Sequence, residues 1–245
     1  MIKKIIFIFL ILPSVVFSYE IYFYVAASMT KPAKEVVRKF NSQSKVDHII
    51  LITGGSGQLL NKIIFSKKGD VYLPASKSFK DKAEKAGIVL ETISFLYQTP
   101  VFGLSEIGER EIKSFEDLAY KEVRIALGNP KTMALGKIYE DIKIKMPKNL
   151  ASGIEKNMVV LALNVSQIVN YLKTNTVDAG IIFDSVARVN SFTYLKFPDN
   201  YAEKDVASIN LLKFSKDMEK VKRFISFLVK NKDVFKKYGF EVIDK

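Results

Sequence analysis

The chain of 245 residues is long enough for one large domain or for two lobes with a core each. Hydrophobic residues make up 48% and charged residues 26% of the sequence, which is typical of a globular protein and excludes extended disorder. The sequence has no cysteine, so disulfides, cysteine-bound zinc, iron–sulfur clusters and thiol catalysis are excluded. A zinc enzyme or a Ser-His-Asp hydrolase would need the single histidine, His48, which begins a predicted strand instead of ending one. We therefore expect a protein that is not an enzyme and carries no cofactor.

The formal net charge of +12 indicates an anionic partner. A basic surplus fits nucleic acid, an anionic membrane surface or a small anionic ligand. Nucleic-acid-binding proteins cluster lysine and arginine with interleaved aromatic residues, whereas the lysines here are spread along the chain. We therefore expect no nucleic-acid partner, and a mildly positive field that attracts oxyanions.

The first 18 residues have the layout of a secretory signal peptide. Lys3 and Lys4 precede an unbroken apolar run at residues 5–12, and compact residues lead to a cleavage position after Ser18. The apolar stretch is shorter than the roughly 20 residues that span a bilayer, which argues against a membrane anchor. We expect export to the periplasm, with a mature chain that starts at Tyr19. Removal of the two lysines changes the net charge from +12 to +10.

Hydrophobic periodicity predicts strands and helices that alternate along the mature chain. In the first half we expect strands at 21–26, 48–52, 71–73 and 99–104, and helices at 30–41, 58–65 and 79–86. In the second half we expect strands at 123–127, 179–183 and 208–212, and helices at 134–144, 165–173, 218–230 and 233–238.

This order of elements predicts an α/β fold of two lobes, each a mostly parallel sheet flanked by helices, with the ligand cleft between them. No linker rich in proline, glycine or serine separates two halves. We therefore expect strands to cross between the lobes near residues 98–102 and 197–206. Lobe 1 would comprise residues 19–100 and 206–245, and lobe 2 residues 101–205.

Two strand-to-helix junctions in the first half carry a serine suited to an anion. In open α/β sheets, ligands lie beyond the carboxyl ends of strands, where the first N–H groups of a helix favour negative charge. Ser28 occupies the predicted N-cap position of the helix at 30–41, and the alternative to a ligand contact is a plain cap. Ser56 lies among three glycines at 54, 55 and 57, which either admit a ligand to the backbone or form a tight turn.

Two further junctions lie in the second half, at the loop of residues 127–136 and at Asn164, which can cap the helix at 165–173. Together the four junctions would line a cleft with N–H and O–H donors. A fully deprotonated tetrahedral dianion accepts hydrogen bonds and has no proton to donate. A pocket with donors and no carboxylates suits such an ion, and Ser28, Ser56 and main-chain amides provide those donors.

Several short motifs in this order resemble the periplasmic molybdate-binding proteins of ABC transporters. They are AAS (26–28), a glycine–serine turn (54–57), GDVYLPAS (69–76), GNPKTMALGKI (128–138), NV (164–165) and DAGIIF (178–183). The resemblance covers nearly the whole mature chain. It implies a type II periplasmic binding protein fold, in which hydrogen bonds alone hold the oxyanion between the lobes. It also implies a monomer that delivers molybdate or tungstate to a membrane permease.

The resemblance implies five ligand contacts in this sequence. Ser28 matches the first ligand serine of the family, which donates its hydroxyl and its amide, and Ser56 matches the second. Leu135 lies where the family usually has an alanine that donates its amide. Val165 lies where a valine at a helix N-terminus donates its amide. Phe183 lies where many members have a tyrosine whose hydroxyl binds the anion.

Phe183 departs from the family pattern because phenylalanine has no hydrogen-bond donor on its side chain. A hydrogen bond lost to a charged ligand costs about 1.5–3 kcal/mol when nothing replaces it. A water, Thr132 or Ser185 is the candidate replacement.

Two other classes of function remain open at the level of the sequence. One is a receptor for a different anion, such as sulfate, phosphate or an organic acid. A phosphate site should offer an acceptor to the proton of the ligand, and Asp184 is the carboxylate near the predicted site. The other class is an exported enzyme on a related fold, although neither serine has a neighbouring base in the sequence.

Overall fold

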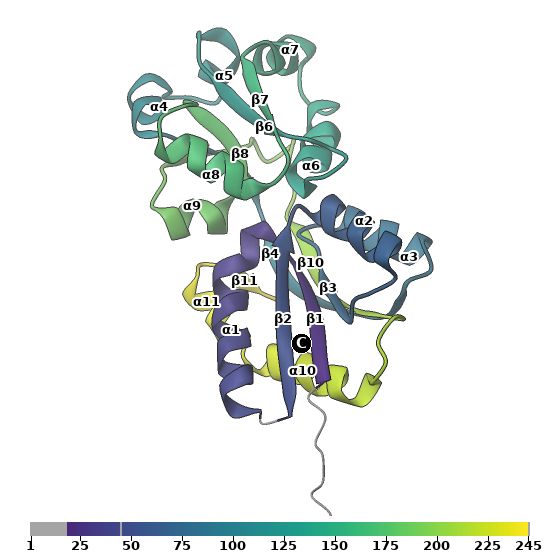
Figure 1. Ribbon diagram of the computed structural model, residues 1–245. Helices are drawn as coiled ribbons and strands as arrows, with labels where there is room; N and C mark the ends of the chain where they lie inside the picture. Colours follow the sequence, from purple (N-terminus) through teal and green to yellow (C-terminus); the bar gives the residue numbers. More distant parts are fainter. Residues whose placement is uncertain (1–18, 45, 245) are drawn as a thin grey trace, which may run out of the picture.

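The computed structural model describes residues 19–44 and 46–244 (Figure 1). The expected signal peptide, residues 1–18, lies outside these described residues. Within them, none of the helices combines the length and the apolar character needed to cross a bilayer. The described chain forms two lobes, drawn one above the other in Figure 1.

Lobe 1 contains a six-stranded sheet with the strand order β11-β4-β10-β3-β1-β2. Strand β1 pairs in parallel with β2 and β3, whereas β10 pairs antiparallel with β3 and β4, and β11 pairs antiparallel with β4. The elements of lobe 1 are β1 (Tyr19–Ala26), the 3-10 turn η1 (Ala27–Met29), α1 (Thr30–Gln43), β2 (Asp47–Gly54), α2 (Ser56–Ser66), β3 (Val71–Leu73), α3 (Lys77–Lys85), β4 (Val89–Gln98), β10 (Asp205–Leu212), α10 (Met218–Lys230), α11 (Asp233–Lys237) and β11 (Glu241–Val242).

Lobe 2 contains a five-stranded sheet with the strand order β7-β6-β8-β5-β9. Strand β6 pairs in parallel with β7 and β8, and β5 pairs antiparallel with β8 and β9. The elements of lobe 2 are β5 (Pro100–Leu104), α4 (Glu106–Glu111), α5 (Asp117–Tyr120), β6 (Ile125–Gly128), α6 (Ala134–Lys143), α7 (Lys148–Lys156), β7 (Met158–Ala162), α8 (Val165–Lys173), β8 (Ala179–Phe183), α9 (Asp184–Asn190) and β9 (Tyr194–Lys196).

Each sheet buries apolar side chains against its helices, as the periodicity predicts. In lobe 1, helix α1 buries Val36 and Phe40, and the rings of Phe23 and Phe40 pack edge-on against Phe224 of α10 at 5.1 and 5.3 Å. In lobe 2, the ring centroid of Phe102 in β5 lies 6.5 Å from that of Tyr139 in α6. The predicted α/β fold with two sheets flanked by helices is confirmed. Parallel pairing joins β1 to β2 and β3 in lobe 1, and β6 to β7 and β8 in lobe 2, so the expected parallel order holds for only part of each sheet.

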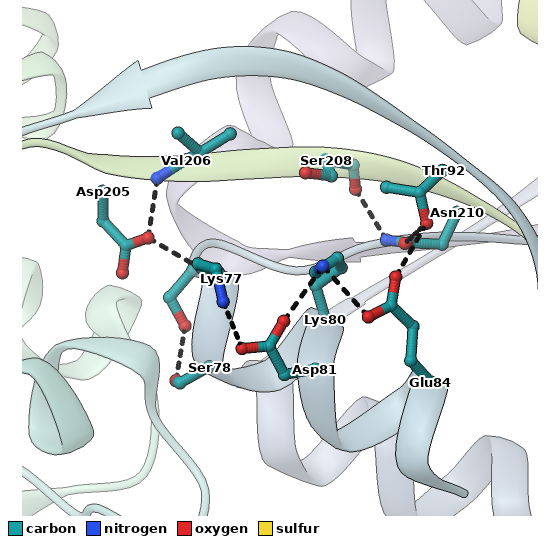
Figure 2. Close-up of polar contacts among 11 residues, drawn as sticks. Lys77, Ser78, Lys80, Asp81, Glu84, Thr92, Asp205, Val206, Ser208 and Asn210 are labelled. Carbon is teal, nitrogen blue, oxygen red and sulfur yellow. Dashed lines mark hydrogen bonds and ion pairs between the residues drawn. The ribbon is translucent and has the colours of Figure 1, made fainter. Parts of the chain in front are cut away.

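The chain crosses between the lobes twice, after β4 and before β10. Asp205 begins β10 at the second crossing and lies against the start of α3 (Figure 2). One of its carboxylate oxygens accepts hydrogen bonds from the backbone N–H groups of Lys77 at 2.9 Å and Val206 at 2.6 Å. Burial raises the pKa of Asp205, and these two donors oppose that rise. The second crossing segment is thus attached to the first turn of α3, which has no side-chain cap of its own.

Candidate functional site

A small pocket lies between the lobes and brings together the five residues singled out in the sequence, namely Ser28, Ser56, Leu135, Val165 and Phe183. Its cavity volume is about 20 Å³, slightly more than the roughly 10–15 Å³ that one water molecule needs. The twelve lining residues are Ala26, Ala27, Ser28, Gly54, Gly55, Ser56, Ala75, Met133, Ala134, Leu135, Val165 and Phe183. The size of the pocket suits a small ion.

The register of β1 and β2 places the two serines on the lobe 1 side of this pocket. The strands are parallel, and Ala26 at the end of β1 pairs with Gly54 at the end of β2. The chain leaves both strands at the same sheet edge, so Ser28 and Ser56 follow two residues later at neighbouring positions. The strand-to-helix junctions predicted from the sequence therefore meet because of the strand pairing.

Ser28 lies in the 3-10 turn and has a buried hydroxyl without a hydrogen-bond partner among the described residues. The expectation that Ser28 is the N-cap of α1 is wrong. The N-cap is Met29, and no side chain caps this helix. Helix α1 begins at Thr30, as predicted, and the 3-10 turn at Ala27–Met29 places Met29 directly before it. A plain capping role is thereby excluded, and the hydroxyl stays free for a ligand.

Ser56 is the first residue of α2, and its hydroxyl is oriented by the neighbouring backbone. Its Oγ accepts a hydrogen bond from the backbone N–H of Ala75 at 3.1 Å, which leaves its own proton available to a ligand. The hydroxyl of Tyr72 donates to the Ser56 carbonyl at 2.7 Å and fixes the backbone there. Burial raises the pKa of Tyr72 well above its ordinary value, so this phenol stays a donor.

Lobe 2 presents the first turns of two helices to the same pocket. Leu135 is the second residue of α6, and Val165 is the first residue of α8. First-turn N–H groups have no partner within their own helix, and in the described chain those of Leu135 and Val165 form no other hydrogen bond. Asn164 caps α8, as predicted, because its side-chain oxygen accepts from the N–H of Gln167 at 3.2 Å. Both amides can therefore donate to an anion.

Phe183 ends β8 and forms part of the pocket wall, with 1% of its surface exposed. It adds an apolar face and no donor. The two side chains considered as replacement donors, Thr132 and Ser185, have buried hydroxyls without a partner among the described residues, but neither lines the pocket. Sequence reasoning did not single out Ala75 as a site residue, although it lies in the GDVYLPAS motif. Its proximity to Ser56 depends on the tertiary fold.

The pocket has no ionisable side chain among its twelve lining residues. Asp184, the nearest carboxylate in the sequence, is directed elsewhere. It accepts hydrogen bonds from the backbone N–H of Ser185 at 2.8 Å and pairs with Arg188 at 3.0 Å. The lining therefore combines hydroxyl and amide donors with apolar atoms and includes no carboxylate acceptor.

The two lobes contact each other directly beside the pocket. The backbone N–H of Gly57 in lobe 1 donates to the carbonyl of Thr132 in lobe 2 at 2.9 Å. A Cβ atom on Gly55 would lie 2.5 Å from the carbonyl oxygens of Thr132 and Leu163. On the opposite side, Arg188 of lobe 2 donates to the carbonyl of Gly239 in lobe 1. The structure is thus a closed arrangement, and glycine is required where the backbones approach.

Three distant relatives have names that describe binding proteins. A candidate binding protein of Haemophilus influenzae is 28% identical over 66% of this chain and 65% of its own length, so the match spans just under two thirds of that relative. A candidate substrate-binding lipoprotein of an ABC transporter in Bacillus subtilis is 26% identical over 88% of this chain and 84% of its own. A molybdate-binding protein of Mycobacterium tuberculosis is 22% identical over 84% of this chain and 77% of its own.

Solved structures of binding proteins have the same fold. The periplasmic molybdate-binding protein of Azotobacter vinelandii has a TM-score of 0.76 and 17% identity, covering 91% of this chain and all of its own. The sulfate-binding protein of Mycobacterium tuberculosis has a TM-score of 0.78 and 14% identity, covering 92% of this chain and 88% of its own. At these identities the likeness shows the fold, which is that of periplasmic binding proteins.

The family profile of bacterial extracellular solute-binding proteins covers most of this chain, from residue 21 to residue 241. The match includes both lobes and every residue that lines the pocket between them. The resemblance noted in the sequence is thus confirmed by the family and by the fold. The chain belongs to the bacterial extracellular solute-binding proteins.

Proposed function

We propose that this protein captures molybdate or tungstate in the periplasm and delivers it to the permease of an ABC transporter. The observation that carries the proposal is the uncharged pocket between the lobes, where two serine hydroxyls and the free first-turn amides of α6 and α8 converge. Ser28 and Ser56 would bind from lobe 1, and Leu135 and Val165 from lobe 2. Phe183 would pack against the ion without a hydrogen bond.

The donor set favours an oxyanion that carries no proton. Molybdate, tungstate and sulfate are fully deprotonated dianions near neutral pH, whereas phosphate keeps a proton that needs an acceptor. Asp184 would be that acceptor, but its carboxylate is engaged by Arg188 and by backbone N–H groups. Helix N-termini stabilise negative charge without a counter-ion, so the absence of a lining cation is compatible with a dianion.

The choice of molybdate or tungstate over sulfate rests on the relatives. The mycobacterial relative matched over 84% of this chain is a molybdate-binding protein, and the sequence motifs resemble that family. A sulfate-binding protein shares the fold, so sulfate is the principal competitor. Export through a cleavable signal peptide at residues 1–18 is part of the same proposal. A binding protein that delivers its ligand to an ABC permease must meet the permease on the outer face of the membrane.

A small organic phosphate is a second candidate ligand, favoured by a larger cavity next to the pocket. This cavity has a volume of about 230 Å³, shares Ser28 and Val165 with the pocket, and includes Lys31 and Lys173 in its lining. One solved structure of the same fold, with a TM-score of 0.71 and 18% identity, contains bound L-phospholactate. An oxyanion head in the small pocket would leave room for an organic substituent in the cavity.

Calorimetric titration tests the proposal most directly. Molybdate, tungstate, sulfate, phosphate and phospholactate are each titrated into the purified protein. We expect tight binding of molybdate and tungstate, with weaker or undetectable heats for the other three. If neither molybdate nor tungstate gives a heat of binding, the proposal is refuted. A heat of binding with phospholactate alone would favour the organic phosphate.

A further inference from the structure

Gln98 is a buried amide at the first crossing between the lobes, outside the lining of the pocket. It is the last residue of β4, with 0% of its surface exposed. Its Nε2 donates to the carbonyl of Ala75 at 2.8 Å, while its Oε1 has no hydrogen-bond partner among the described residues. A buried acceptor without a partner is unfavourable, so packing alone would be served better by methionine or leucine. The amide donor is the feature that distinguishes glutamine at this position.

The contact of Gln98 continues into the pocket through a single residue. Ala75 accepts from Gln98 with its carbonyl and donates to the Oγ of Ser56 with its N–H. All three residues are at most 3% exposed, so water does not compete for these bonds. Gln98 therefore holds the Ala75 backbone in the position from which its N–H reaches the serine hydroxyl.

This arrangement determines the direction of the Ser56 proton. A serine hydroxyl has one proton and two acceptor lone pairs. Because the Ala75 N–H occupies one lone pair of Ser56, the proton points away from Ala75, and a single lone pair remains beside it as a possible acceptor. A displaced Ala75 would free the second lone pair and the rotation of the hydroxyl, so Ser56 would accept a hydrogen bond from a ligand more readily.

The residue after Gln98 contacts the other lobe through its backbone. The carbonyl of Thr99 accepts from the N–H of Asp184 at 2.9 Å, directly after Phe183 in the pocket wall. Two consecutive residues of the crossing segment thus secure Ser56 on one side of the pocket and Phe183 on the other. The pocket geometry depends on this segment as well as on the lining residues.

We infer that Gln98 is a positioning residue that keeps the Ser56 hydroxyl a donor and so makes the pocket select oxyanions without a proton. The inference rests on the proposed function of the site. It assigns a role in ligand selection to a residue that touches no ligand. Loss of the Gln98 amide should weaken binding of molybdate more than binding of phosphate, whose proton a rotated Ser56 hydroxyl can accept.

Calorimetry with molybdate and with phosphate on the variant Gln98→Met tests this inference. Methionine fills a similar volume without the amide donor. We expect the affinity for molybdate to fall about tenfold, as for one lost hydrogen bond to a charged ligand, while the affinity for phosphate changes about twofold or less. Gln98→Asn, which keeps an amide too short to reach Ala75, should show the same pattern if the methionine variant does not fold.

A double-mutant cycle with Ser56→Ala separates positioning from a general structural effect. If Gln98 acts through the Ser56 hydroxyl, Gln98→Met should change molybdate affinity by about twofold or less when alanine already occupies position 56. The matched control is Asn41→Leu, which removes another amide bound to backbone, 3.2 Å from the Ile49 carbonyl and at the far end of lobe 1. This control should leave molybdate affinity and the molybdate-to-phosphate ratio unchanged.

Three results would overturn the inference while the proposed function stands. These are unchanged molybdate affinity in a folded Gln98 variant, an equal loss for molybdate and phosphate, and full additivity with Ser56→Ala. Retention of wild-type affinity in Ser56→Ala itself would instead remove Ser56 from the site, and with it the basis of this inference.

Discussion

Ser28 and Ser56 face one pocket, yet their hydroxyls are in different states. The Ser28 hydroxyl is buried without a partner among the described residues, whereas that of Ser56 already accepts from Ala75. A buried hydroxyl without a partner lowers stability, because its hydrogen bonds to water are lost and not replaced. Ser28 is therefore the residue for which ligand binding and stability should diverge most clearly.

We expect Ser28→Ala to weaken molybdate binding by about 1 kcal/mol or more, since a donor to a charged ligand is lost. The unliganded variant should be no less stable than the original protein, because an unpaired polar atom has been removed. Calorimetry measures the first effect and thermal unfolding without anion the second. Ser185→Ala is the matched control, since its hydroxyl is also buried and unpaired in the described structure but lies outside the pocket lining. Loss of affinity in the control alone would contradict the assignment.

At the residue scale, the sequence predicted part of the site and missed the rest for a physical reason. The serines stand out by residue type, and Leu135 and Val165 were placed through the family resemblance because their side chains carry no chemistry. Ala75 and Gln98 were not recognised. Both act through bonds that only the tertiary fold creates, so no local pattern marks them.

At the scale of elements, predictions succeeded where periodicity is strong. The bounds of β3, α8, β8 and α10 agree with the predicted ranges, and the other predicted helices and strands agree within a few residues. Strand β4 (Val89–Gln98) was missed because most of its first half is exposed or half-buried, which removes the alternation that marks a strand. Edge strand β7 (Met158–Ala162) was missed for a related reason, since its apolar side chains are largely exposed.

The start of α2 contains the glycine whose replacement should interfere with closure. A Cβ atom on Gly57 would lie 2.2 Å from the carbonyl oxygen of Lys131 and 2.9 Å from the Cα of Thr132, both in lobe 2. Backbone atoms of this kind cannot move aside as the end of a flexible side chain can. The closed arrangement therefore requires glycine at this position. The position of the Ser56 hydroxyl in lobe 1 does not depend on these contacts with lobe 2.

We expect Gly57→Ala to weaken molybdate binding by about 1–3 kcal/mol, the usual cost of forcing extra atoms into a packed contact. The loss should appear mainly as faster dissociation, because the lobes can no longer close fully around the ion. Stopped-flow measurement of both rate constants checks this. An unchanged dissociation rate would show that the contact between Gly57 and Thr132 does not retain the ligand.

At the scale of the whole molecule, charge and pocket are separated. The chain has 38 lysines and arginines against 26 aspartates and glutamates, but none of these side chains lines the pocket. A field from distant charges attracts an anion during approach and is screened by salt, whereas contacts with amides and hydroxyls are short-ranged. The basic surplus should therefore govern the rate of capture, and the pocket the rate of release.

We expect the association rate of molybdate to fall several-fold as sodium chloride is raised from about 0.01 M to about 0.5 M, as the Debye length contracts. The dissociation rate should change little over the same range. Stopped-flow kinetics at constant pH gives both values, and sucrose solutions of matched viscosity serve as the control. A salt effect located mainly in dissociation would contradict this division of roles.

The proposed donors of α6 and α8 are main-chain N–H groups, so most side-chain substitutions cannot test them. An alanine scan preserves every peptide N–H, so it would pass over Leu135 and Val165 and report two unimportant positions. Proline is the substitution that deletes this group, and the first position of a helix accepts it without breaking the helix. Val165 holds that position in α8, and the extended backbone of Asn164 before it (φ −157°, ψ 164°) is compatible with a following proline. Val165→Pro would thus remove the backbone N–H at position 165, one of the proposed donors to the ion, and leave helix α8 in place.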